Sequence, residues 1–316
     1  MTRGVTRVAA VDCGTNTIRL LVADLDPASG TLDSLVRELR IVRLGQDVDR
    51  TGRLADDALE RVLAATDEYA ATIERHDVEA LRFVATSAVR DATNADAFVE
   101  GVRARLGVPP EVLSGDEEAR LSYEGATRAL PAVPGPVAVV DIGGGSTEVV
   151  LGDPAGGGVR AARSLDVGSV RLTERLMPSD PPPRTEVDAA TAVVDQALDT
   201  LPSYGVRLSE AATVVGVAGT VTTIAAVLLG LETYDRERVH HASFPRGDVH
   251  DVVARLLGMT VAEREALGVP PGRSDVIGAG ALVLDRVLRR SGAGRLTVSE
   301  ADILDGVAWS LLGELR

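Results

Sequence analysis

The chain has 316 residues, of which 45% are hydrophobic and 25% are charged, so it has the length and composition of a soluble globular protein with one large or two ordinary domains. Its formal net charge of −14 argues against a general binder of nucleic acids or anionic membranes. All 33 basic residues are arginines, which excludes a Walker A phosphate loop and Schiff-base catalysis because both need a lysine.

The first part of the chain predicts three strands followed by alternating helices and strands. An apolar run precedes Asp12, and a second one follows the polar turn within the segment 12–24, so the two runs predict a pair of strands. LVRELRIVRLG at 35–45 predicts a third strand. The later elements are a helix at 56–74, a strand running into a turn at 81–90, a helix at 94–106, a short strand at 112–113 and a helix at 116–130. This order is typical of a ribonuclease-H-like unit, in which parallel crossovers follow three antiparallel strands.

The same pattern begins again after the proline-rich segment PAVPGP at 131–136. A second strand, turn and strand cover 137–153. The later elements are an exposed loop at 177–183, a helix at 186–201, a strand with a Gly-Thr turn and a buried helix at 214–230, helices at 249–257 and 276–290, and a strand and helix from Leu296 onwards. The sequence therefore predicts a second α/β domain.

The two predicted hairpins resemble each other. DCGTNTIRLLVAD at 12–24 and DIGGGSTEVVLGD at 141–153 share the opening Asp, a Gly two places on, a hydroxyl residue at the sixth place and a closing Asp. An apolar run precedes each segment. We interpret the pair as a duplicated domain, in which each copy presents one turn toward a shared cleft.

Both turns have residues suited to binding phosphate. Glycines between two strands let backbone N–H groups converge on an anion without side-chain clashes. The candidate residues are Gly143, Gly144, Gly145, Ser146 and Thr147 in the second turn, and Gly14, Thr15, Asn16 and Thr17 in the first. Asp12 and Asp141 would repel phosphate unless a hard cation such as Mg²⁺ lies between, with Glu148 as a further ligand. A single turn is as often a plain hairpin, but two in register favour phosphate binding.

The segment SGDEEAR at 114–120 places three acidic residues, Asp116, Glu117 and Glu118, in the first turn of a helix. One such carboxylate could orient and deprotonate a water molecule for attack on phosphorus. The commoner reason for acids at this position is their interaction with the helix dipole. The pattern alone leaves both interpretations open.

Two further positions are candidates for anion binding. Arg90 ends the strand predicted for ATSAVRDA, at the carboxyl edge where ligands of such sheets bind, and its guanidinium could neutralise phosphoryl oxygens. Gly219 and Thr220 begin a helix whose N-terminal amides could hold an anion. Taken singly, each is as often structural, as a surface arginine or a tight turn.

These motifs together resemble the Ppx/GppA family of exopolyphosphatases and guanosine pentaphosphate phosphohydrolases. The motifs are DCGTNTIRLLVAD, ATSAVRDA, SGDEEARLSYEGA and DIGGGSTEVV, and the likeness continues through GVAGTVTT, RSDVIGAGALVL and VSEADILDGVA. One hairpin alone would indicate only the wider acetate kinase, sugar kinase, Hsp70 and actin superfamily. The resemblance implies two ribonuclease-H-like domains around a central cleft: residues 1–130, completed by a C-terminal helix at 299–316, and residues 131–298.

The resemblance also implies roles for individual residues. Glu118 would be the catalytic base, and Asp141 and Glu148 would serve the metal and the water. Asp12, at the position corresponding to Asp141, is a further candidate metal ligand. Phosphate would be held by Arg90 and by Gly14, Thr15, Asn16, Thr17, Arg19, Gly143, Gly144, Gly145, Ser146, Gly219 and Thr220. The chain departs from the family pattern at Leu304 and Asp305, where members often carry Arg-Glu, so a C-terminal contact to substrate is not expected.

The implied activity is exopolyphosphatase activity, the release of terminal phosphate from inorganic polyphosphate by water with Mg²⁺ or Mn²⁺. Guanosine pentaphosphate 5′-hydrolysis, an ATP-dependent kinase of the same superfamily, and a non-catalytic polyphosphate or alarmone sensor remain as alternatives. Because the chain is acidic and stops after two domains, we expect a preference for short polyphosphate and distributive release.

The sequence also indicates the cellular location and the partners of the protein. It has one cysteine, Cys13, and no apolar run long enough to span a membrane, which favours a reducing, cytoplasmic location. We expect no nucleic-acid or membrane partner. A homodimer is expected, and two subunits together could supply a basic track that one chain lacks.

Overall fold

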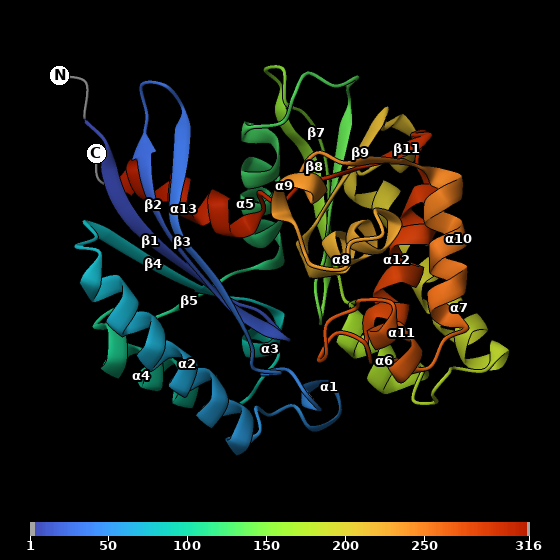
Figure 1. Cartoon of the computed structure of the whole chain (residues 1–316), viewed down its shortest axis with the longest axis horizontal. Coiled ribbons are helices and arrows are strands. Elements are labelled where there is room, and N and C mark those ends of the chain that lie inside the picture. The colour runs from blue at the N-terminus through green and yellow to red at the C-terminus, as the bar shows by residue number, and fades with distance from the viewer. Residues whose placement is uncertain (1–3, 315–316) are drawn as a thin grey trace. The chain divides into compact units, whose positions relative to one another are not determined.

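Two mixed β-sheets with helices packed against them form the described part of the chain (Figure 1). The structure is a computed structural model and describes residues 4–314. The chain divides into two units: the first runs to Leu121 and resumes at Ile303, and the second is Ser122–Asp302. The division falls within helix α5 (Gly115–Arg128). The predicted α/β class is confirmed.

The sheet of the first unit has five strands in the order β3-β2-β1-β4-β5. They are β1 (Thr6–Cys13), β2 (Thr17–Asp26), β3 (Thr31–Ile41), β4 (Ala80–Ala85) and β5 (Glu111–Val112). The first three pair antiparallel, and β4 and β5 join in parallel. This is the predicted ribonuclease-H-like order. Because β1 and β4 are parallel neighbours, their carboxyl ends lie at one edge of the sheet.

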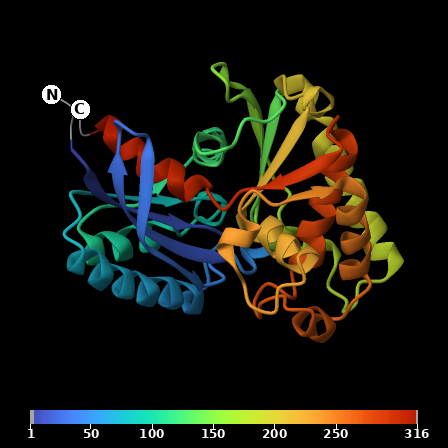
Figure 2. The same cartoon turned by 45° about the horizontal axis from the view of Figure 1, so that its top comes forward.

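Helices cover both faces of this sheet. They are α1 (Val48–Thr51), α2 (Asp56–Arg75), α3 (Ser87–Arg90), α4 (Ala95–Leu106) and α13 (Ile303–Glu314). α2 and α4 pack on one face through Val62, Tyr69 and Phe98, all fully buried. α13 packs on the other face through Val307 and Trp309, and Figures 1 and 2 show it across the sheet from α2.

The sheet of the second unit has the order β10-β11-β9-β6-β7-β8. Its strands are β6 (Val137–Ile142), β7 (Thr147–Asp153), β8 (Gly158–Leu165), β9 (Thr213–Val217), β10 (Ser243–Pro245) and β11 (Arg295–Val298). β6, β7 and β8 pair antiparallel, and β9 and β11 follow in parallel, so the order of the first unit is repeated. β10 adds an antiparallel edge strand.

Helix α12 (Ile277–Arg290) of the second unit is buried over most of its length. The other helices of this unit are α6 (Ser169–Leu176), α7 (Arg184–Asp199), α8 (Ala218–Leu228), α9 (Arg236–Val239), α10 (Arg246–Leu257) and α11 (Val261–Ala266), with short 3₁₀ helices at Leu201–Tyr204 and Leu208–Glu210. α12 packs against α6, α7, α8 and α10. Among the helices of residues 4–314, none is both long and apolar enough to cross a membrane.

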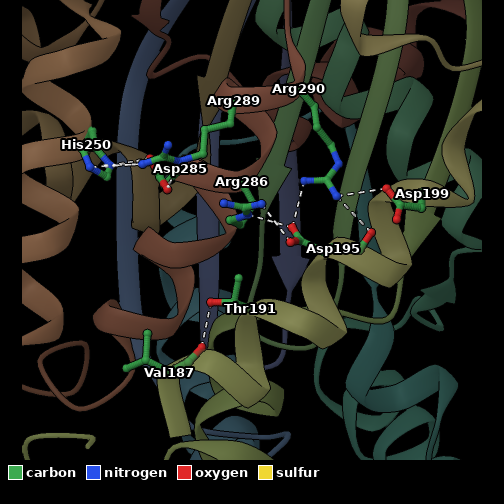
Figure 3. Close-up of polar contacts among 9 residues, drawn as sticks. All are labelled: Val187, Thr191, Asp195, Asp199, His250, Asp285, Arg286, Arg289 and Arg290. Atoms are coloured by element: carbon green, nitrogen blue, oxygen red, sulfur yellow. Dashed lines mark hydrogen bonds and ion pairs between the residues drawn. The ribbon is translucent and has the colours of Figure 1, made fainter. Parts of the chain in front are cut away.

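Ion pairs fix α12 to its neighbours (Figure 3). Asp195 on α7 accepts hydrogen bonds from Arg286 Nε at 2.7 Å and Arg290 Nη1 at 2.8 Å. Burial alone would raise the pKa of Asp195, but the two guanidinium groups outweigh it and hold that pKa below its ordinary value. On the α10 side, Asp285 lies between His250 (3.0 Å) and Arg289 (2.7 Å).

The structure corrects several sequence predictions. The third strand, predicted at 35–45, begins at Thr31 and ends at Ile41. Arg90, predicted at a strand end, is the last residue of the short helix α3. Strand β8 and helix α6 were not predicted, because β8 has exposed and half-buried residues without a clean alternation.

Close packing of α13 against α5 depends on a glycine. A Cβ at Gly306 would lie 2.1 Å from the carbonyl oxygen of Leu121, so backbone must move to admit it. We expect Gly306→Ala to lower the free energy of unfolding by about 2 kcal/mol or more, as overpacking does. Denaturant unfolding followed by circular dichroism measures this.

Gly313→Ala in the same helix is the control. Nothing lies within 4 Å of a Cβ at Gly313, so alanine should be neutral or stabilise by up to about 1 kcal/mol through its helix propensity. Equal stability of Gly306→Ala and the wild-type protein would contradict the proposed close approach.

Candidate functional site

The second glycine turn, residues 143–146, joins β6 to β7 and is closed by a hydrogen bond from Gly143 N to Ser146 O at 3.0 Å. The N-terminal end of α6 binds the carbonyl oxygens of this turn. The bonds run from Ser169 N to Gly143 O (2.9 Å), from Val170 N to Gly144 O (2.8 Å) and from Arg171 Nε to Gly145 O (2.8 Å). The first turn of α6 therefore fixes the turn from behind.

This support determines where the N–H groups of the turn are directed. In a trans peptide the N–H is directed opposite to the carbonyl. Because the carbonyls of residues 143–145 face α6, the N–H groups of Gly144, Gly145 and Ser146 are directed to the other side. Within residues 4–314 these three groups donate no hydrogen bond. Consecutive N–H groups in this arrangement form a concave site for an anion.

The first turn, residues 14–17, has the same construction. It is closed by a hydrogen bond from Gly14 N to Thr17 O at 2.9 Å. The segment after β3 binds its carbonyls, through bonds from Gly45 N to Thr15 O (2.8 Å) and from Val42 N to Asn16 O (3.0 Å). The N–H groups of Asn16 and Thr17 are therefore directed away from that segment.

A glycine lies directly behind each turn. A Cβ at Gly168 would lie 2.4 Å from the carbonyl oxygen of Gly144, and a Cβ at Gly45 would lie 2.3 Å from Cγ2 of Thr15. Gly168 has a φ of −138°, which any residue can adopt. The close approach of the turn, and not the backbone conformation, therefore requires glycine here.

Asp141 and Glu148 lie directly opposite each other on β6 and β7. Their exposed fractions are 6% and 1%. Each accepts a hydrogen bond from a serine hydroxyl, Asp141 Oδ2 from Ser122 at 2.6 Å and Glu148 Oε1 from Ser164 at 2.7 Å. Opposite residues of an antiparallel pair have Cβ atoms roughly 4.5–5.5 Å apart. The structure therefore places two buried carboxylates at neighbouring positions on one face of the sheet, and a cation between them would offset their like charges.

Asp12 and Arg19 occupy the corresponding positions on β1 and β2 and are also opposite each other. Arg19 Nε and Nη2 donate to Asp12 Oδ2 at 3.0 and 2.6 Å. Asp12 was predicted as a metal ligand and Arg19 as a phosphate-binding residue. The structure pairs the two side chains. Arg19 therefore reduces the negative charge that Asp12 could offer to a cation, and Asp12 reduces the positive charge that Arg19 could offer to phosphate.

The carboxylate pair in the second unit suits a Mg²⁺ ion. Mg²⁺ is usually bound through one or two carboxylates, with water and substrate phosphates completing its octahedron. Among residues 4–314, no group of three or more His, Cys, Asp or Glu side chains could enclose a metal. Asp141 and Glu148 thus suit a Mg²⁺ ion that also binds water and substrate, and they do not suit a metal enclosed by protein ligands alone.

Arg90 and Glu118 contact each other in the first unit. Helix α3 begins where β4 ends, and its Ser87 hydroxyl lies 2.9 Å from that of Thr15 in the first turn. Arg90 Nη1 donates to Glu118 Oε2 at 3.1 Å and to Leu113 O at 2.8 Å. Its Nε and Nη2 form no hydrogen bond within the described part of the chain. They are therefore available to phosphate oxygens.

The structure distinguishes the adjacent acids of the SGDEEAR segment. Glu117 accepts the backbone N–H (2.9 Å) and hydroxyl (2.7 Å) of Ser114, and the Ser114 hydroxyl in turn accepts Glu117 N–H. This is a capping box, and these hydrogen bonds hold the pKa of Glu117 below its ordinary value. Glu118 is instead 7% exposed and held by Arg90. Glu117 therefore stabilises the start of the helix. Glu118 is the acid that is buried and paired with an arginine, as expected of a residue in a functional site.

Helix α8 begins beside the second turn, because β6 and β9 are parallel neighbours in which Asp141 is level with Val217. Ala218 has a φ of +65°, an unusual conformation for a residue with a side chain and one that occurs often at functional sites. The next residues, Gly219 and Thr220, are the predicted anion-binding pair. A Cβ at Gly219 would lie 2.7 Å from Cζ of Arg273, so that guanidinium lies against this helix start.

Sequence reasoning missed four residues that the structure places at these sites: Ser122, Ser164, Gly168 and Arg273. The duplication itself contained a signal for Ser164, because a third strand follows the first hairpin and a matching one should follow the second. Gly168 and Arg273 are brought to the site by packing between segments far apart in sequence.

Comparisons with known proteins identify the family of the chain. A family model described as the Ppx/GppA phosphatase family matches residues 21–315. The chain is 47% identical to Exopolyphosphatase 2 of Mycobacterium tuberculosis (strain ATCC 25618 / H37Rv), covering 98% of this chain and 99% of that protein. A solved exopolyphosphatase-like protein has 42% identity and a TM-score of 0.95, covering 99% and 100% of the two chains. The Aquifex aeolicus Ppx/GppA family member has 32% identity and a TM-score of 0.82, covering 99% of each.

We expect Gly168→Ala to displace the second turn and lower kcat/KM for phosphate release by roughly 10²-fold, because a misplacement of about 1 Å has that effect. The thermal unfolding midpoint and circular dichroism spectrum establish that the variant is folded. Gly247→Ala, on α10 with nothing within 4 Å of its Cβ, is the matched control and should keep wild-type activity. A folded Gly168→Ala protein with wild-type kcat/KM would contradict the role of α6 in fixing the turn.

Proposed function

The chain belongs to the Ppx/GppA phosphatase family, and on this premise we propose that it is an exopolyphosphatase, a hydrolase that releases the terminal phosphate of inorganic polyphosphate. The observation that carries the proposal is the second turn, where three outward N–H groups adjoin a row of two buried carboxylates. The 47% identity to Exopolyphosphatase 2 over nearly the whole of both chains supports the same substrate.

The phosphate chain would be held by backbone and guanidinium donors. The N–H groups of Gly144, Gly145 and Ser146 suit the oxygens of one phosphoryl group. In the first unit, Arg90 offers Nε and Nη2. The start of α8, with Gly219 and the guanidinium of Arg273 against it, suits a further phosphate.

Asp141 and Glu148 would hold a divalent cation through two carboxylates of the second unit. Bound Mg²⁺ would neutralise charge on the terminal phosphates. The oxygen donors of this row favour Mg²⁺ or Mn²⁺ over Zn²⁺, which prefers nitrogen and sulfur ligands. Arg19 neutralises one oxygen of Asp12, so Asp141 and Glu148 are the stronger candidates.

Glu118 would act as the general base that takes a proton from the attacking water. Its carboxylate is buried, and Arg90 Nη1 holds one of its oxygens at 3.1 Å. This contact orients the carboxylate for its proposed role. The same arginine can contact phosphate through its remaining donors, which would couple the base to the bound substrate.

Phosphate release from polyphosphate, guanosine pentaphosphate and ATP, measured side by side in Mg²⁺ and in EDTA, tests the proposal. We expect polyphosphate to be the best substrate by kcat/KM, with activity lost in EDTA and restored by Mg²⁺. Preference for guanosine pentaphosphate would indicate that the protein is a guanosine pentaphosphate phosphohydrolase instead. Binding of polyphosphate without turnover in Mg²⁺ would instead indicate a sensor.

For the base, we expect Glu118→Gln to lower kcat by about 10²–10⁴-fold, because an amide cannot accept the proton of water. Polyphosphate binding, measured by calorimetry, should change little. The control is Glu117→Gln in the adjacent position, where glutamine can still form the capping box, so turnover should stay near wild type. Wild-type turnover in Glu118→Gln would remove this residue from the mechanism.

For chain length, we expect preference for short polyphosphate and distributive release. A processive grip needs an extended basic track, whereas this chain carries a net charge of −14 that repels distant phosphates. Gel electrophoresis of long polyphosphate during digestion should show a ladder of intermediate lengths. Loss of long chains without intermediates would show that the protein, as a monomer or a dimer, holds its substrate processively.

A further inference from the structure

Three residues of the second unit lie side by side on one face of its sheet, and a fourth residue, on a helix, contacts the first of them. Asp141 on β6 is opposite Glu148 on β7, and Glu148 is opposite Ser164 on β8. Side chains at directly opposite positions of neighbouring strands share a face of the sheet. The fourth residue, Ser122 of helix α5, completes the row by donating its hydroxyl to Asp141.

The first unit has a row at the same register, and its chemistry differs. There Asp12 is opposite Arg19, and Arg19 is opposite Leu39 on β3. The arginine neutralises Asp12 directly, and no hydroxyl group occupies the third position. In the second unit the arginine is replaced by Glu148 and the leucine by Ser164, so the hydroxyl accompanies the second carboxylate.

The hydroxyl bonds restrict both carboxylates. Ser164 Oγ donates to Glu148 Oε1 at 2.7 Å, and Ser122 Oγ donates to Asp141 Oδ2 at 2.6 Å. Each bond takes one oxygen of its carboxylate and fixes the plane of the group. Two like charges tend to turn away from each other, and these two donors oppose that rotation. With them, the pair is held in one arrangement before any cation arrives.

We propose that Ser122 and Ser164 are positioning residues that hold Asp141 and Glu148 in the orientation that binds a divalent cation. The inference rests on the proposed function for the identity of the metal ligands. It assigns a role to two residues that the predicted site does not contain, Ser122 within the SGDEEARLSYEGA motif and Ser164 outside the quoted motifs. Groups that orient metal ligands through hydrogen bonds typically contribute 10- to 100-fold to metal affinity.

Binding of Mn²⁺ to the full chain without substrate, measured by the electron paramagnetic resonance signal of free Mn²⁺, tests this role. We expect Ser164→Ala to raise the Mn²⁺ dissociation constant by about 10-fold or more, and Ser164→Thr, which keeps the hydroxyl, to restore most of the affinity. Ser122→Ala should weaken binding similarly, although alanine favours the helix that carries it. Ser203→Ala, which removes an exposed hydroxyl far from the row in sequence, should leave the affinity unchanged.

A second readout separates positioning from folding. At saturating Mg²⁺ the turnover of Ser164→Ala should recover to within a few-fold of wild type, with the half-saturating Mg²⁺ concentration raised. Mn²⁺ affinity equal to wild type in both alanine variants would overturn the inference, whatever their thermal stability. Failure of the wild-type protein to hydrolyse polyphosphate would sink the proposed function, and the Mn²⁺ titration would still decide the role of the two serines.

Discussion

The opposite directions of C=O and N–H in a trans peptide constrain both candidate sites. A turn that presents its N–H groups to an anion directs its carbonyls to the opposite side, where other groups can bind them. In the second unit the first turn of α6 binds them, and in the first unit the segment 42–45 does so. The elements behind the turns are therefore as necessary as the turns. Gly168 and Gly45 allow them to approach.

The two units share this frame and differ in charge. The row Asp12, Arg19, Leu39 balances its carboxylate with a guanidinium. The row Asp141, Glu148, Ser164 sets two buried carboxylates against each other. The first row therefore contains a balanced ion pair, and the second contains two acidic side chains with a serine. Conservation of the strand order keeps both rows at the same register.

Helix α5 carries two groups with different partners. Glu118 contacts Arg90, and Ser122, four residues further on, contacts Asp141. The capping box of Ser114 and Glu117 fixes the start of that helix and thereby the position of Glu118.

The sequence by itself determined the fold class, the duplication and most strands and helices, because apolar periodicity and glycine turns are local signals. It also determined the two turns, since their pattern occurs twice. Only the tertiary structure decided which of three adjacent acids is buried against Arg90, that Arg19 pairs with Asp12, and that Ser122 and Ser164 hold the carboxylates. Those contacts join residues 7 to 28 positions apart across strands and helices. Their partners are set by strand register and helix packing, which no local pattern of residues specifies.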